Sequence, residues 1–192
     1  RVWDIYTPKA EFLRDALVEM NETPDDLHYA DLGAGSGYFV AGMRDLGWMN
    51  SHGFEVSEVQ SRLAEAMISD GAIKTHALGE VVDIAATVEA DVVSMIGVLE
   101  HVQTPRLIVN ALRENPHVRY LYISVPLFSP STMIECAFPN VFQRQLSAGH
   151  THLFTNSSLD WLCQEFGMSR LSEWWFGTDV VDIFRSISVE LE

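Results

Sequence analysis

Apolar side chains recur along the chain in two patterns, short continuous runs and stripes at helical spacing, and the two patterns alternate. Runs of about four to eight apolar residues are typical of buried strands, and stripes that repeat every three or four residues are typical of helices. The predicted strands are Leu27–Leu32, Ser51–Val56, Ile73–Leu78, Asp91–Ile96, Tyr120–Val125 and Met168–Phe176. This order predicts an α/β fold in which helices cover a mostly parallel sheet.

Helix boundaries carry their own signals. Thr7 and Pro8 stand where one apolar stripe begins, and Ser57 with Gln60 three residues later forms a capping box for another helix. The remaining predicted helices are Tyr38–Leu46, Thr104 to about Arg113, and one that is capped by Asn156 or Ser157 and ends at Gly167. Residues 127–152 fit neither pattern and predict a long irregular segment, which in a compact domain is usually functional or disordered.

The length of the chain limits its organisation. With 192 residues, of which 47% are hydrophobic, it is long enough for one full core and too short for two comfortable ones. We therefore expect a single domain over residues 1–192. Because the chain begins at Arg1 without a Met, we expect the native N-terminus to be missing. Cys136 and Cys163 show no pairing pattern, which favours a reducing cytoplasm.

The charge of the chain limits its partners. Twelve Lys and Arg against 27 Asp and Glu give a formal net charge of −15. An acidic surface repels phosphate backbones and anionic lipid headgroups, so neither a nucleic acid nor a membrane is expected as a partner. No apolar run approaches the roughly 18 residues that a membrane span needs. Whether the protein is a monomer or a homodimer stays open.

A glycine cluster lies between the first predicted strand and the helix that follows. Gly33, Gly35 and Gly37 let the backbone turn tightly and approach a ligand without obstruction by a Cβ atom. A dinucleotide fingerprint would require a further glycine where Tyr38 stands, so NAD or FAD binding fits poorly. A Walker loop is excluded because no Gly-Lys-Ser/Thr follows. An ordinary turn is the alternative to a ligand-binding loop.

A carboxylate ends the second predicted strand. Glu55 lies 22 residues after Gly33. An acid at this place can accept hydrogen bonds from both hydroxyls of a ribose, as in nucleotide-binding α/β folds. The alternative is a solvated acid at the end of a strand. Together with the glycine cluster, Glu55 favours a ligand that contains a nucleoside.

Asp31, Gly33, Gly35 and Gly37 resemble the D/E-x-G-x-G-x-G first motif of class I S-adenosylmethionine-dependent methyltransferases. The stretch Val98–Val102, VLEHV, is similar to one found in many small-molecule members of that family, and the resemblance covers roughly residues 5–176. It implies a Rossmann-like three-layer sandwich with a mostly parallel sheet of seven strands, or six, and Ile187–Leu191 is the candidate for the last strand. It also implies S-adenosyl-L-methionine as cofactor and S-adenosyl-L-homocysteine as product.

The resemblance assigns the cofactor's parts to particular residues. The loop wraps the cationic methionine part, for which Asp31 is a favourable neighbour. Glu55 meets the ribose, Leu78 and Gly79 meet the adenine, and Ile96 and Gly97 border the methionyl part. The complete set is Asp31, Gly33, Ala34, Gly35, Ser36, Gly37, Tyr38, Glu55, Val56, Leu78, Gly79, Ile96 and Gly97.

Two histidines lie at the end of the irregular segment. The stretch Gly149–Thr155, GHTHLFT, is similar to a His-x-His-plus-aromatic stretch in methyltransferases that act on nucleotide-linked sugars. In those relatives a histidine is a proposed general base, and an imidazole has the right pKa for proton removal near neutrality. His152 and His150 are therefore the candidate catalytic residues. The alternative is that they only hold the segment by hydrogen bonds. The pair could also bind a metal, but spacing shows no further ligand, so no metal is expected.

The function predicted from these motifs is transfer of a methyl group from S-adenosylmethionine to a small-molecule acceptor. The resemblance around His152 narrows the acceptor to a nucleotide-linked sugar or a glycan precursor. A catalytically silent domain that binds S-adenosylmethionine for assembly or sensing is the alternative. A nicotinamide-dependent reductase is opposed by Tyr38 at the position of the missing glycine.

Overall fold

The computed structural model describes residues 2–68, 71–139, 146 and 149–175. The chain divides into two compact units. The sheet unit comprises Arg1–Val98 and Thr104–Ser124, and the C-terminal unit comprises Leu99–Gln103 and Val125–Glu192. The expectation of a single domain stays a prediction.

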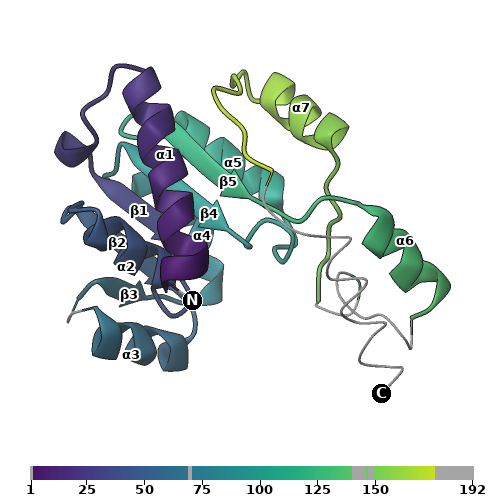
Figure 1. The fold of residues 1–192 in the computed structure, drawn as a ribbon, viewed down its shortest axis with the longest axis horizontal. Helices are drawn as coiled ribbons and strands as arrows, with labels where there is room; N and C mark the ends of the chain where they lie inside the picture. The colour runs from purple at the N-terminus through teal and green to yellow at the C-terminus, as the bar shows by residue number, and fades with distance from the viewer. Residues whose placement is uncertain (1, 69–70, 140–145, 147–148, 176–192) are drawn as a thin grey trace. The chain divides into compact units, whose positions relative to one another are not determined.

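A parallel sheet in the order β3-β2-β1-β4-β5 forms the centre of the sheet unit (Figure 1). Its strands are β1 (Tyr29–Leu32), β2 (Ser51–Glu55), β3 (Ile73–Thr75), β4 (Val92–Ile96) and β5 (Tyr120–Ser124). All four residues of β1 are buried, as expected for a central strand covered on both faces. The strand order reverses between β1 and β4. In open α/β sheets a ligand crevice lies at such a point, outside the carboxyl ends of the strands.

Helices cover both faces of this sheet (Figure 1). They are α1 (Thr7–Glu19), α2 (Tyr38–Asp45), α3 (Glu58–Met67), α4 (Val81–Thr87) and α5 (Pro105–Glu114), with a π-helical turn at Val2–Tyr6 and 3-10 turns at Pro24–Asp26 and Leu78–Glu80. The first three helices share one core cluster with β1, in which the Tyr29 ring stacks on Trp48 at 4.5 Å. Helices α4 and α5 pack together, and Asn115 ties them by donating to the carbonyls of Ala85 and Val88.

The C-terminal unit contains α6 (Pro130–Ala137) and α7 (Asn156–Glu165) among its described residues. Leu127 and Phe154 form an isolated parallel bridge, and the Thr155 hydroxyl caps α7 by accepting from the Ser158 amide. None of the described helices in either unit is both long and apolar enough to cross a membrane.

The predicted α/β class is confirmed, but the predicted number of strands is wrong for the part of the chain that the structure describes. Five strands are present there, against the expected seven or six. Residues 168–175 are not a strand. Their aromatic side chains suit a strand, but strand propensity depends on packing against a neighbouring strand, and they pair with no strand among the described residues. Phe176 and the candidate Ile187–Leu191 lie outside the described residues.

Three further expectations need correction. The segment 127–152 is not wholly irregular, because Ser129 and Pro130 provide a cap and a first-turn proline for α6. The third strand stops at Thr75, and Leu78 lies in a 3-10 turn instead. Helix α4 was not predicted, since its seven residues are too few to show a clear helical stripe.

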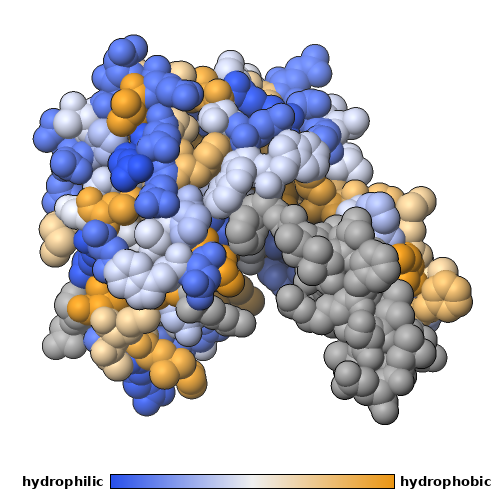
Figure 2. Space-filling view, in the orientation of Figure 1, coloured by the Kyte–Doolittle hydropathy of each residue, from blue (hydrophilic) through white to orange (hydrophobic). Residues whose placement is uncertain are grey.

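The sheet unit exposes apolar side chains on α3. Val59, Leu63 and Met67 recur every four residues and are exposed, and Figure 2 shows apolar surface at the lower left, where α3 lies. Residues four apart share one face of a helix. The face of α3 that turns away from the core is therefore partly apolar.

Candidate active site

The glycine loop leaves β1 in a left-handed backbone conformation. Gly33, Gly35 and Gly37 have φ values of 73°, 56° and 73°, which side chains with a Cβ atom rarely adopt. The amides of Gly33 and Ala34 both donate to the carbonyl of Phe54, each at 2.9 Å. The loop is thus tied to the end of β2.

The three loop glycines meet different surroundings. A Cβ atom on Gly33 would lie 2.6 Å from Val98, and one on Gly37 would lie 2.8 Å from Ile68, so these two glycines permit close packing inside the sheet unit. A Cβ atom on Gly35 would meet only the flexible Gln60 side chain, at 3.0 Å. At Gly35 it is therefore the backbone conformation that requires a glycine, and close packing against a neighbour contributes less.

Glu55 organises this loop. Its Oε2 atom accepts from the Gly35 amide and its Oε1 atom accepts from the Ser57 amide, each at 2.8 Å, and the residue is only 6% exposed. The sequence had suggested that both oxygens serve a ribose. Each oxygen keeps a further lone pair, so the carboxylate retains the capacity to accept from a ligand while it holds the loop.

Gly53 is a residue that the sequence reasoning missed. A Cβ atom there would lie 2.5 Å from the Ala34 side chain and 2.7 Å from Ile73. The glycine loop can therefore pack against β2 only because position 53 has no side chain. A glycine inside a predicted strand was the available signal, because such glycines often mark a close approach of another segment.

Asp31 is buried at the end of β1, with 3% of its surface exposed. The Ser94 hydroxyl from β4 donates to its Oδ1 atom at 2.6 Å. The pKa of Asp31 is raised to about 7, because burial and, to a smaller extent, the negative charge of Glu55 raise it by more than the Ser94 hydrogen bond lowers it. Burial also raises the pKa of Tyr122, and Asp31 adds to that effect. The glycine loop therefore lies beside a carboxylic acid whose ionisation is disfavoured by burial.

The other residues assigned to the cofactor lie at the carboxyl ends of the strands or just after them. Gly97 follows β4 with φ of 68°, is exposed, and donates its amide to the Ser124 carbonyl at 2.9 Å. Ile96 is half-buried, and Val56 is exposed. Leu78 and Gly79 are exposed, Leu78 to 75%. Within the glycine loop Ser36 and Tyr38 are half-buried.

The two candidate catalytic histidines have separate partners in the C-terminal unit. His152 Nδ1 lies 2.9 Å from the Thr151 hydroxyl, and its ring centroid lies 6.4 Å from that of Phe154. The His150 ring meets His101 edge-on, with centroids 4.7 Å apart. The structure therefore brings His150 together with a residue of the VLEHV stretch, which spacing alone did not indicate.

A family model described as a methyltransferase domain matches residues 7–173. The chain belongs to this methyltransferase domain family. It is a class I S-adenosylmethionine-dependent methyltransferase, an enzyme, and S-adenosylmethionine is its cofactor.

Solved structures of other methyltransferases share the fold at low sequence identity. Magnesium protoporphyrin IX methyltransferase from Synechocystis PCC 6803, with bound S-adenosylhomocysteine, is 15% identical with a TM-score of 0.65, over 90% of this chain and 78% of that one. The plantazolicin methyltransferase BpumL is 14% identical with a TM-score of 0.64, over 98% and 79%. A methyltransferase from Archaeoglobus fulgidus is 14% identical with a TM-score of 0.52, over 95% and 87%. The comparison with curated proteins gave no match.

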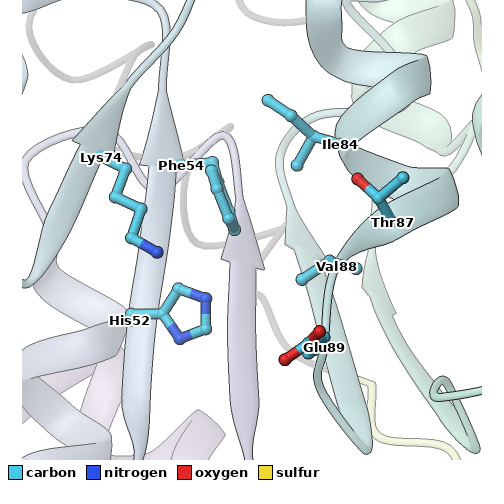
Figure 3. A pocket seen from close by; sticks show the side chains of 7 residues that line it. All are labelled: His52, Phe54, Lys74, Ile84, Thr87, Val88 and Glu89. Atoms are coloured by element: carbon cyan, nitrogen blue, oxygen red, sulfur yellow. The ribbon is translucent and has the colours of Figure 1, made fainter.

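The methyltransferase also has a cavity of about 370 Å³ against β2 and the edge strand β3 (Figure 3). His52 and Phe54 of β2 and Lys74 of β3 face the end of α4 across it. Burial, with smaller contributions from Lys74 and Arg44, lowers the pKa of His52. Alternate side chains of a strand point to opposite faces, so the side chain of Glu55 points to the other face from Phe54. None of the residues assigned to the cofactor lines this cavity.

Proposed function

We propose that this methyltransferase transfers the methyl group of S-adenosylmethionine to a small-molecule acceptor, and that the acceptor is a nucleotide-linked sugar or a glycan precursor. The observation that carries the cofactor assignment is the hydrogen bond from the Gly35 amide to the buried carboxylate of Glu55. It joins the two parts of the chain that the resemblance assigns to one nucleoside-containing ligand.

The loop suits a ligand of this kind in shape. Three left-handed glycines expose backbone next to the ends of β1 and β2, and Gly33 itself is exposed to solvent. Glu55 accepts from the Gly35 amide and holds the loop in this conformation, and a loop held in place loses less entropy when a ligand binds. We propose that the remaining lone pairs of Glu55 accept from the ribose hydroxyls.

The loop also suits the charge of the ligand. The methionine part of S-adenosylmethionine carries an ammonium and a sulfonium, and Asp31 and Glu55 are acids at the ends of adjacent strands. A cation that binds near Asp31 favours the ionised form of that buried acid. The same pair of carboxylates would repel a pyrophosphate. Charge and loop shape therefore favour this cofactor over a dinucleotide.

When bound, the cofactor supplies a methyl group that is already activated for displacement, so the protein's tasks are alignment and proton removal. We propose that His152 takes the proton from the acceptor. Its ring is half-buried, and the Thr151 hydroxyl at Nδ1 orients it and leaves Nε2 for another partner. The backbone amide of His152 donates to the Glu100 carbonyl at 3.2 Å, which anchors the segment that carries the ring.

A small-molecule acceptor is supported by the net charge of −15, which disfavours nucleic acid. Two similar structures are named as methyltransferases of magnesium protoporphyrin IX and of plantazolicin. The sugar part of the proposal rests on the resemblance of Gly149–Thr155 to the stretch in sugar-acting methyltransferases.

Two measurements test the proposal. Calorimetric titration with S-adenosylhomocysteine is expected to give one site per chain, and an absence of binding would refute the cofactor assignment. Incubation with S-adenosylmethionine and a panel of nucleotide-linked sugars, followed by mass spectrometry, is expected to give a product heavier by one methyl group. Methylation of a non-sugar small molecule alone would overturn the sugar assignment and leave methyl transfer intact. Cofactor binding without methylation of any acceptor in a broad panel would favour the silent binding domain.

A further inference from the structure

Three metal-ligating side chains converge in the C-terminal unit. Glu100 and His101 directly follow one another in the VLEHV stretch, and His150 comes much later in the chain. One ligand atom from each, a carboxylate oxygen and two ring nitrogens, lies within 4.8 Å of the others. One cation can contact three ligands only when their atoms lie this close together, since metal–ligand bonds are about 2.0–2.3 Å long.

The backbone holds the two segments together independently of these side chains. The Thr151 amide donates to the Glu100 carbonyl at 2.7 Å, and the Thr151 hydroxyl lies 3.0 Å from that carbonyl and 3.1 Å from the carbonyl of Val102. His150 immediately precedes this anchor. Backbone hydrogen bonds thus hold together the two segments that carry the three side chains. This lowers the entropy lost when the side chains are ordered around an ion.

The histidine rings are arranged as metal ligands commonly are. His101 Nδ1 lies 3.4 Å from the Gly149 carbonyl, an outer contact of the kind that orients a ligating imidazole and leaves its other nitrogen available. The Nδ1 atom of His150 is buried and has no hydrogen-bond partner among the described residues. A buried ring nitrogen without a partner is costly unless something binds it. Its position next to His101 and Glu100 points to a cation.

The chemistry of the three ligands selects the kind of ion. Imidazole nitrogens suit zinc, copper, iron and nickel, and a carboxylate also suits manganese, whereas magnesium and calcium prefer sites made of oxygen alone. Three protein ligands leave at least one coordination position open. Exposure falls from the open His101 through the half-buried His150 to Glu100, which is 2% exposed. The site is therefore accessible to an ion from the side of His101.

We propose that Glu100, His101 and His150 bind a divalent transition-metal ion such as Zn²⁺ or Mn²⁺. The residues of this site are separate from those of the glycine loop, and the proposal departs from the expectation of no metal that spacing alone had suggested. His150 is then a metal ligand, and His152 is the remaining candidate for the general base. The proposal requires no methyl transfer, so its test does not depend on the acceptor.

The test uses the full chain without a histidine tag, stripped of metal by a chelator. Equilibrium dialysis against Zn²⁺ and Mn²⁺ is expected to leave one ion per chain, and Co²⁺ is expected to give visible ligand-field absorption that Zn²⁺ abolishes. His101→Asn is the first variant because this side chain is exposed and its loss should not impair folding. Removing one of three ligands is expected to weaken Zn²⁺ binding by at least about tenfold, the lower bound for loss even of an outer-shell partner. Glu100→Gln and His150→Asn are expected to do the same.

The control variant is His117→Asn, an exposed histidine of the sheet unit whose loss should leave ion binding unchanged. Far-ultraviolet circular dichroism and S-adenosylhomocysteine titration report whether each variant is folded. Unchanged Zn²⁺ affinity in folded His101→Asn would overturn the proposal. Equal retention of Mg²⁺ and Zn²⁺ by the wild type would also overturn the proposal. Loss of Zn²⁺ binding in His117→Asn alone would do the same. Absence of S-adenosylhomocysteine binding in the wild type, with Zn²⁺ binding retained, would refute the cofactor assignment to the glycine loop and leave this proposal standing.

Discussion

The buried acid at the end of β1 offers the sharpest test of the site. Asp31→Asn keeps the size of the side chain and leaves an oxygen to accept from the Ser94 hydroxyl. It removes the ability to ionise and replaces the other carboxyl oxygen by an amide NH2 group. Because Asp31 is buried beside Glu55, we expect this substitution to stabilise the ligand-free protein at neutral pH and to weaken cofactor binding.

The magnitude follows from the pKa. In the folded chain the pKa of Asp31 is about 7, against an ordinary value of 3.8. Each unit of difference corresponds to about 1.4 kcal/mol, so the ionised side chain costs the folded state about 4 kcal/mol above pH 7. Between these two pKa values the folded state binds more protons than the unfolded state, so stability falls as the pH rises. From pH 5 to pH 8, Asp31 alone should lower the free energy of unfolding by about 3 kcal/mol.

The assay is urea unfolding of the ligand-free wild type and Asp31→Asn at pH 5 and at pH 8. The stability advantage of the variant should grow by about 3 kcal/mol between the two pH values. Asp45→Asn, at an exposed position on α2, controls for the removal of one negative charge. An advantage of Asp31→Asn that is the same at both pH values would refute the reasoning, because Asp31 would then not titrate in this range.

Further substitutions separate the roles of the other site residues. Glu55→Ala should weaken S-adenosylhomocysteine binding by about 1.5–3 kcal/mol, the scale of charged hydrogen bonds, and unchanged calorimetric affinity would reject the assignment. Gly35→Val should impair S-adenosylhomocysteine binding more than folding. Gly37→Ala should chiefly lower the unfolding midpoint, because its Cβ atom would lie 2.8 Å from Ile68. Normal S-adenosylhomocysteine binding by folded Gly35→Val would contradict the assignment of this loop to the cofactor. His152→Ala should reduce turnover by about 10²–10⁴-fold with nearly intact cofactor affinity, and near-normal turnover would exclude a base role.

Local sequence signals determined the parts of the fold that depend on neighbours along the chain. Glycines at 33, 35 and 37 specify the left-handed turn because other residues rarely adopt positive φ. Half of the predicted capping box of α3 is confirmed, since the Ser57 hydroxyl accepts from the Gln60 amide three residues away; the other half is wrong, because the Ser57 amide donates to Glu55 instead. The central strand β4, with the sequence VVSMI, was readable because strands covered on both faces are almost continuously apolar.

Packing between distant segments decided the rest. Residues 168–175 have suitable side chains for a strand but no partner to pair with in the described structure, and a strand exists only through its hydrogen-bonded neighbour. The raised pKa of Asp31 needs burial by the surrounding sheet, and the engagement of Glu55 with the Gly35 amide needs β2 beside the loop.

The convergence of His150 with Glu100 and His101 shows the same limit most clearly. Sequence spacing could place the two candidate histidines near each other but could not bring in a glutamate some fifty residues away. That contact depends on the Thr151 hydrogen bonds to the Glu100 carbonyl. The types of residue available for chemistry are a property of the sequence, whereas their meeting in space is set by backbone hydrogen bonds and burial that form only when the chain has folded.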